Sequence, residues 1–269
     1  MRRTRKYILG FIGCGHMGMA IARGAVMKEY IERYQICIYD PNEEVRKACA
    51  KESFTVMNSA KEVAEASHIT MLAVRPQQLE EVLTELDGAA IENVLSIVTG
   101  VSIEYLQSRL NNVPVIRAMP NTPLQINEGA TAMCMSENCK ADEYDFVFQM
   151  FNSMGVTRTI PESKMNEVIA VSGSTPAYVY YFIQSLVNDA KERGLDEYDM
   201  RDLVVQTFIG AASLLKQNRK TPISVFIDEV CSEGGTTIEA IGEMKKQDID
   251  KVIHDANEAC IERARQLGR

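Results

Sequence analysis

The sequence predicts an α/β fold, with an N-terminal doubly wound sheet of parallel strands followed by an all-α C-terminal region. The first observation is that short β-type runs alternate with helical patterns up to about residue 160, as in βαβ units. The second is that only helical patterns follow Pro161. The length of 269 residues suits one large domain or two modest ones. We expect two domains, residues 1–161 and 162–269.

The elements of the first domain follow from β-branched runs and helical periodicity. Strands are expected at 8–13, 36–39, 69–74, 94–98 and 113–118, with two edge strands at 131–135 and 155–159. Helices are expected at 16–27, 43–51, 60–66, 77–86, 103–110 and near 144–152. Asn58 or Ser59 and, further on, Ser102 are expected to cap helices, because their side-chain oxygens accept first-turn amides.

The second domain is expected to contain only helices, at 164–171, 177–192, 199–217, 222–229, 236–246 and 248–266. Pro176 and Pro222 suit first turns, and Gly194 suits a helix end. The helix at 199–217 leaves almost no polar face between Leu203 and Leu215, so it must be covered on all sides. A partner subunit would cover it; the alternative is that it runs through the middle of a monomeric bundle.

Composition and charge exclude several classes of protein. The chain is 46% hydrophobic, 25% charged and 7% aromatic, as in ordinary globular proteins. A net charge of −8 argues against nucleic acid or an anionic membrane as a partner. No apolar run approaches the ~18 residues of a membrane span, and the stretch after Lys6 is too short for a secretory signal. Seven cysteines without a CxxC pair indicate free thiols in a reducing cytoplasm and no metal site.

A glycine-rich loop, Gly13-Cys14-Gly15-His16-Met17-Gly18, follows the first strand and opens a helix. Asp40 ends the next strand, 22 residues after Gly18. Together they form the dinucleotide-binding fingerprint of a Rossmann domain. Gly13 allows the tight turn, Gly15 the approach of a pyrophosphate, and Gly18 the close packing of helix and strand. The helix N-terminus then supplies N–H donors to the phosphates.

Asp40 bears on the choice of cofactor. Its carboxylate would accept hydrogen bonds from a ribose and repel a 2′-phosphate, which favours NADH over NADPH. The alternative is that Asp40 caps the following helix, and the two roles are compatible. Arg46 lies a helical turn further on.

Few residues can serve as a general acid for carbonyl reduction. His16 lies in the glycine loop, His68 begins a strand, and His254 lies on the last helix; each is expected to have a structural or cofactor-side role. This favours a substrate that is already protonated, such as an iminium, with Lys164 or a tyrosine as the alternative acid. The loop before the helix at 236–246 offers glycine amides and hydroxyls to a carboxylate, although an ordinary helix cap is the alternative.

Five ordered motifs resemble those of the pyrroline-5-carboxylate reductase family, over essentially the whole chain. They are Phe11–Gly18, Ala73–Gln77, Ile116–Pro123, Ser172–Tyr178 and Ser232–Thr237. The resemblance implies a Rossmann domain and a helical dimerisation domain, with homodimers that often assemble into a decamer. It implies hydride transfer from NADPH or NADH to the C=N bond of 1-pyrroline-5-carboxylate, which gives L-proline in the last step of proline biosynthesis.

The resemblance also implies roles for matching positions, in a cleft between the two domains. The substrate carboxylate would be held by Ser232, Gly234, Gly235, Thr236 and Thr237, with Thr237 also catalytic through a hydrogen bond to the ring nitrogen. The cofactor would be held by Gly13, Gly15, His16, Met17, Gly18, Ala73, Val74, Arg75 and Pro76, with Met119, Asn121 and Pro123 near the nicotinamide. Asp40 joins this set through its spacing from the glycine loop.

Two residues depart from the family pattern: Glu233 replaces a proline in SPGGTT, and Thr175 replaces a glycine in SGSGPAY. A second carboxylate about 4 Å from the substrate would cost roughly 1 kcal/mol in water and about 4 at an effective dielectric constant of 20, so Glu233 is expected to face solvent. Most members use NADPH, against the inference from Asp40, and both cofactors stay open. The alternatives are a β-hydroxyacid dehydrogenase-like carbonyl reductase using Lys164, and a non-catalytic dinucleotide-binding protein.

Overall fold

The computed structural model describes residues 5–268 and divides the chain into two compact units. Unit 1 runs up to Pro176 and includes the C-terminal residues from Ala259, whereas unit 2 comprises Ala177–Glu258. The functional boundary at residue 161 stays a prediction, because residues 162–176 pack with unit 1. Within the described part of the chain, no helix has both the length and the apolar character needed to cross a bilayer.

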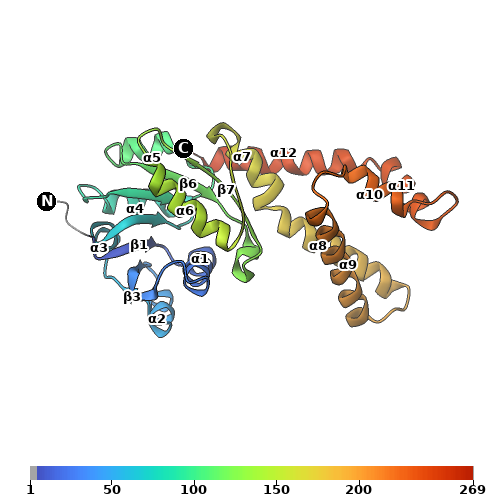
Figure 1. Ribbon diagram of the computed structural model, residues 1–269, viewed down its shortest axis with the longest axis horizontal. Helices are drawn as coiled ribbons and strands as arrows, with labels where there is room; N and C mark the ends of the chain where they lie inside the picture. The colour runs from blue at the N-terminus through green and yellow to red at the C-terminus, as the bar shows by residue number, and fades with distance from the viewer. Residues whose placement is uncertain (1–4, 269) are drawn as a thin grey trace. The chain divides into compact units, whose positions relative to one another are not determined.

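Unit 1 is built on one eight-stranded sheet with the order β3-β2-β1-β4-β5-β6-β7-β8 (Figure 1). The strands are β1 Tyr7–Ile12, β2 Ile36–Tyr39, β3 Thr55–Val56, β4 Ser67–Leu72, β5 Asn93–Ser96, β6 Val115–Met119, β7 Gly129–Met135 and β8 Gly155–Thr159. All neighbouring strands are parallel except β6 and β7, in which Ile116 pairs with Met135. The prediction that β7 is an edge strand is wrong, because β7 also pairs with β8 and therefore lies inside the sheet.

The helices of unit 1 confirm most of the predicted segments. They are α1 His16–Met27, α2 Glu43–Lys51, α3 Ala60–Ala66, α4 Leu79–Glu85, α5 Ile103–Arg109, α6 Ala141–Ser153 and α7 Met165–Val168. Ser59 and Ser102 cap α3 and α5 as expected, each side chain accepting a first-turn N–H. The larger differences are that a 3₁₀ turn, Pro76–Gln78, precedes α4 and that the segment after α7 is a π-helical turn, Ile169–Gly173.

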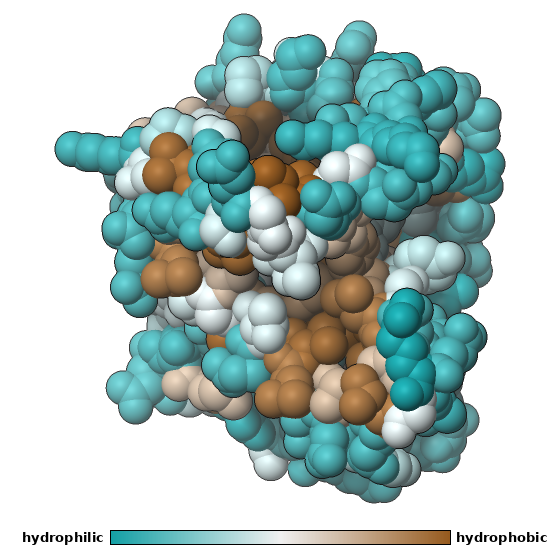
Figure 2. Space-filling model, turned by 90° about the vertical axis from the view of Figure 1, so that its right-hand side faces the viewer, coloured by the Kyte–Doolittle hydropathy of each residue, from teal (hydrophilic) through white to brown (hydrophobic). Residues whose placement is uncertain are grey.

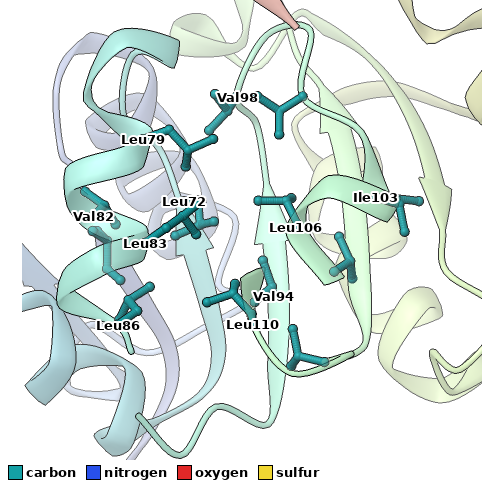
Figure 3. Packing of buried hydrophobic residues seen from close by; sticks show 14 of the residues in the cluster. Leu72, Leu79, Val82, Leu83, Leu86, Val94, Val98, Ile103, Leu106 and Leu110 are labelled. Carbon is teal, nitrogen blue, oxygen red and sulfur yellow. The ribbon is translucent and has the colours of Figure 1, made fainter. Parts of the chain in front are cut away.

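The sheet separates two apolar clusters, one on each face. Figure 3 shows part of one of them, in which Leu83 of α4 and Leu106 of α5 point toward Leu72 and Val94 of the sheet. Ala264, from the end of the chain, belongs to the same cluster. These parallel strands are buried on both faces, which explains their continuous apolar runs.

The regular structure of unit 2 is entirely helical. It contains α9 Glu197–Gln217, α10 Ile223–Val230 and α11 Thr236–Lys246, and parts of two helices that extend into unit 1, α8 Thr175–Glu192 and α12 Ile249–Leu267. Val187 is the one buried residue between 177 and 258, a stretch that is described throughout. On α9, Leu203 is 61% exposed, Ile209 54% and Leu214 53%. Figure 2 views the molecule from the side of these helices and shows apolar residues on that surface. The alternative that α9 is the centre of a monomeric bundle is therefore wrong.

Candidate active site

The turn from β1 to α1 has the geometry of a phosphate-binding loop. Gly13 has a φ of +87°, and a Cβ there would lie 2.7 Å from the carbonyl oxygen of Ala73. A Cβ on Gly18 would lie 2.9 Å from the carbonyl oxygen of Gly13, whereas one on Gly15 would meet nothing within 4 Å. No side chain caps α1, and its first turn holds no acidic residue. The amides at the start of α1 are thus available to an anion.

A cavity of about 330 Å³ adjoins this loop. It is lined by Gly15, His16, Met17, Ala73, Val74, Arg75, Pro76, Ile97, Thr99, Met119 and Pro120. The structure thus brings three predicted motifs together where β1, β4 and β6 end. Two lining residues, Ile97 and Thr99, were missed by the sequence analysis. Their position just after β5 was the available signal, because ligands of open α/β sheets bind beyond the carboxyl ends of the strands.

Two predicted neighbours of the nicotinamide, Asn121 and Pro123, do not line this cavity. Asn121 is buried, and its side chain connects two segments: Nδ2 donates to the carbonyl of Ser172 at 3.3 Å, and Oδ1 accepts the N–H of Ala130 at 2.8 Å. Pro123 lies in the 3₁₀ turn that follows. Two larger hollows, of about 660 Å³ over α9 and about 580 Å³ beside α5, are lined by none of the predicted site residues.

The carboxylate of Asp40 is buried beside the glycine loop. Its Oδ2 accepts the backbone N–H of Cys14 at 2.8 Å, and its Oδ1 accepts that of Asn42 at 2.9 Å. Asn42, and not Asp40, caps α2, because its side chain accepts the N–H of Glu44 at 2.9 Å. The alternative role of Asp40 as the helix cap is therefore wrong. Arg46 donates to the carbonyl of Asp40 at 2.7 Å, which places its guanidinium at the same turn.

The structure places the candidate proton donors as follows. His16 lines the cavity, and His254 is exposed on α12. His68 lies at the amino end of β4, where Glu92 and Glu143 contact its two ring nitrogens at 2.7 and 2.8 Å. Burial lowers the pKa of His68, but the two carboxylates outweigh this effect and raise it above the usual value. Lys164 is an exposed residue that pairs with Glu167 at 3.5 Å. Neither Lys164 nor His68 lines the cavity.

In unit 2, the predicted carboxylate-binding residues form a tight turn that opens α11. The N–H of Gly235 donates to the carbonyl of Ser232 at 3.0 Å, and Gly234 has a φ of +69°. Gly235 is the N-cap of α11 and offers no side-chain cap, so the first-turn amides are available to an anion. Glu233 is exposed in this turn. The substrate-binding set and the catalytic role of Thr237 stay predictions.

Two family models match separate parts of the chain. A family model described as pyrroline-5-carboxylate reductase dimerisation matches residues 162–267, and one described as coenzyme F420-dependent NADP oxidoreductase matches residues 8–100. Pyrroline-5-carboxylate reductase of Escherichia coli (strain K12) is 32% identical over 266 residues, which cover 97% of this chain and 98% of that protein. The corresponding enzyme of Glycine max is 33% identical and covers 98% of this chain and 97% of its own length.

Solved structures agree with these sequence relatives. Pyrroline carboxylate reductase of Plasmodium falciparum, solved with NADP bound, superposes with a TM-score of 0.87 at 29% identity, covering 99% of this chain and 100% of that one. The reductase of Coxiella burnetii superposes with the same score at 26% identity, covering 98% and 100%. Prephenate dehydrogenase of Aquifex aeolicus, at 13% identity and a TM-score of 0.54, shares the fold alone.

Proposed function

Because the chain belongs to the pyrroline-5-carboxylate reductase family, we propose that it transfers hydride from NADPH or NADH to the C=N bond of 1-pyrroline-5-carboxylate and so produces L-proline. Relatives of this name match nearly the whole chain at 32–33% identity. The observation that carries the proposal is the cavity, because residues of three separate family motifs line it together. The carbonyl-reductase alternative requires Lys164 as the proton donor, but Lys164 is exposed and does not line the cavity.

The glycine loop fits a dinucleotide. The uncapped start of α1 and the open space at Gly15 suit a pyrophosphate, whose negative charge the helix N-terminus stabilises. Ala73–Pro76 and Met119 would then line the remainder of the cofactor site, next to the loop. When bound, the reduced nicotinamide supplies the hydride.

The turn before α11 suits the other reactant. The amides of Gly234 and of the first turn of α11, with the hydroxyls of Ser232 and Thr236, would hold the substrate carboxylate, and Gly235 would shape the turn. Thr237, at the second position of α11, would hydrogen-bond the ring nitrogen and orient the C=N carbon. An iminium carbon accepts hydride without a further proton, so the reaction needs no general acid beside it.

The proposal includes an assembly and a location. The exposed apolar side chains of α9 would be covered by a second copy of the chain, in a homodimer that assembles further into a decamer. The family model that matches residues 162–267 is described by dimerisation, which supports this arrangement. A cytoplasmic location is supported by seven cysteines that are all free.

The test measures the oxidation of NADPH and of NADH in the presence of 1-pyrroline-5-carboxylate. The reaction is monitored as the decrease in absorbance of the reduced nicotinamide, and the product is identified as proline. Rapid oxidation that depends on the imine is the expected result. A protein that is folded and binds the dinucleotide but oxidises neither cofactor with this imine would refute the proposal. That outcome would favour a different imine or a non-catalytic protein, and Glu233→Pro would then be the first variant to make.

A further inference from the structure

Strand β6 carries a buried cation, Arg117, that the proposed reaction does not use. Arg117 is 3% exposed. Its Nη1 donates to Oε1 of Glu162 at 3.2 Å, its Nη2 donates to Oδ1 of Asn166 at 3.4 Å, and its Nε is buried without a partner among the described residues. A buried ion pair is often no more stabilising than apolar residues of the same volume. The position of this cation therefore calls for a reason other than stability.

Glu162 joins three segments of unit 1. Besides Arg117 of β6, its Oε1 accepts the N–H of Ile103, the first residue of α5, at 2.7 Å. Glu162 itself lies in the turn between β8 and α7. Its side chain is 35% exposed, so the carboxylate keeps contact with water while it binds the buried guanidinium. Through Glu162 and Asn166, Arg117 fixes the start of the segment that continues as α7.

That segment leads into the π-helical turn Ile169–Gly173. Single π-turns are rare and are frequent at functional sites. The carbonyl of Ser172 in this turn accepts from Nδ2 of Asn121 at 3.3 Å. A Cβ on Gly173 would lie 3.8 Å from the side chain of Met119, which lines the cavity of about 330 Å³. The π-turn is thus packed behind one wall of the cavity.

We propose that Arg117 is a positioning residue for hydride transfer: through Glu162 and Asn166 it holds the π-turn, and the π-turn, which Asn121 ties to the end of β6, holds Met119 in the wall of the cavity. The inference rests on the proposed function. Arg117 lies two residues before Met119 on the same face of β6, so one strand carries both the cation and a residue of the cavity wall. An apolar side chain at position 117 could fill this space but could not hold both partners. A misplacement of about 1 Å at a reacting centre can cost about 100-fold in rate.

The test compares Arg117→Met and Arg117→Lys with the wild-type enzyme in its native assembly. Arg109→Met is the matched control, because it also removes an arginine from an ion pair, with Glu80, in the same unit. The measurements are kcat and KM for 1-pyrroline-5-carboxylate, Kd for NADPH, the melting temperature, and the primary isotope effect with NADPH deuterated at the transferred position.

Arg117→Met is expected to lower kcat by about 10- to 100-fold, with Kd for NADPH unchanged and a larger isotope effect, because hydride transfer becomes the slow step. Arg117→Lys should recover part of kcat, and Arg109→Met should resemble the wild type. A folded Arg117→Met enzyme with full kcat would overturn the inference. The inference would also be overturned if Arg117→Met lost kcat together with NADPH binding and Arg117→Lys recovered neither, because such a result indicates a purely structural effect.

If Arg117→Met does not fold, Glu162→Gln decides. Glutamine keeps an oxygen for the N–H of Ile103 and removes the charge that faces Arg117. A lowered kcat with unchanged NADPH binding supports the positioning role, and an unchanged kcat overturns it. The wild type is assayed first: an inactive wild type refutes the proposed function, whereas an active wild type with a fully active Arg117 or Glu162 variant refutes the positioning role alone.

Discussion

The carboxylate of Asp40 accepts the backbone N–H of Cys14 at 2.8 Å, so the residue after β2 braces the loop that follows β1. Its other oxygen accepts the N–H of Asn42, and the residue is only 8% exposed. Both oxygens are therefore already bound to the protein. A ribose at this position would have to share a carboxylate whose first role is to shape the glycine loop.

Replacing Asp40 by Asn should weaken the binding of NADH and NADPH together. An amide has one acceptor oxygen, so either the buried N–H of Cys14 or the more exposed N–H of Asn42 would lose its partner; the loss at Cys14 would cost about 1–3 kcal/mol in stability. The measurements are the melting temperature and kcat/KM with each cofactor. If the variant keeps its stability and shifts the preference strongly toward NADPH, Asp40 selects the cofactor through the ribose, as its spacing from the glycine loop suggested.

Arg46 is expected to contribute to the binding of NADPH and not of NADH. It donates to the carbonyls of Asp40 and Pro41, at 2.7 and 3.0 Å, at the turn where a 2′-phosphate would lie. Arg46→Ala should raise KM for NADPH about tenfold, which corresponds to about 1.4 kcal/mol, and leave KM for NADH unchanged. Lys47→Ala is the control, because Lys47 pairs with Glu43 and Glu44 on the same helix. An equal effect on both cofactors would contradict this role.

The sequence was sufficient for those features that local chemistry determines. The glycine pattern predicted the backbone that Gly13 and Gly18 adopt, because only glycine fits the positive φ and the close approach observed there. Ser59 and Ser102 cap their helices as expected, since a cap depends on residues only two or three positions away. The nearly continuous apolar run of α9 likewise indicated more apolar side chains than its own unit covers, and Leu203, Ile209 and Leu214 are indeed exposed.

Features that depend on distant parts of the chain were not predictable. Strand β3 has only two residues, too few for a periodic pattern. The antiparallel pairing of β6 with β7 depends on the path of the intervening chain, and not on the composition of either strand. Over only five residues, the spacing of apolar positions does not distinguish a π-turn from an α-helix, so the sequence did not indicate the π-turn Ile169–Gly173. The ion pair between Arg117 and Glu162 spans 45 positions, so no local pattern indicates it.

Thr237→Ala should affect the imine and not the dinucleotide. Thr237 is the second residue of α11, next to the Ser232–Gly235 turn that is proposed to bind the carboxylate. Loss of its hydroxyl should lower kcat or raise KM for 1-pyrroline-5-carboxylate by about tenfold, the effect of one hydrogen bond of about 1.4 kcal/mol. Thr237→Ser keeps the hydroxyl and should be nearly as active as the wild type. A loss of NADPH binding with unchanged imine kinetics would show that this turn does not bind the substrate.

The cluster around His68 should make stability depend on pH. Both ring nitrogens lie within 2.8 Å of a carboxylate oxygen, so the ring binds Glu92 and Glu143 best as an imidazolium that donates twice. The carboxylates raise the pKa of His68 in the folded protein, despite its burial. A raised folded pKa stabilises the fold below the unfolded value of about 6.5, and this contribution is lost as the pH rises through the folded value.

Glu92 sets the acidic limit of the pH range in which the cluster stabilises the fold. Burial raises its pKa, but His68 and Arg5 outweigh burial and lower it, so its contribution is present above the usual pKa of glutamate and is lost as the pH falls through the lowered value. The cluster therefore stabilises unit 1 most in the window between the usual pKa values of glutamate and histidine. The side chain of His68 is 37% exposed, so its contribution should be about 0.2–1 kcal/mol, as for exposed ion pairs.

His68→Gln is the variant that tests this pH dependence, with urea unfolding measured across acidic, neutral and alkaline pH. The wild type should lose stability relative to His68→Gln as the pH rises above 6.5, the usual pKa of histidine, because only the wild type has a charge to lose at position 68. His254→Gln is the control, since His254 is exposed on α12, and it should follow the wild-type profile. A constant difference in unfolding free energy between the wild type and His68→Gln at every pH would show that the ring contributes to stability without changing its charge.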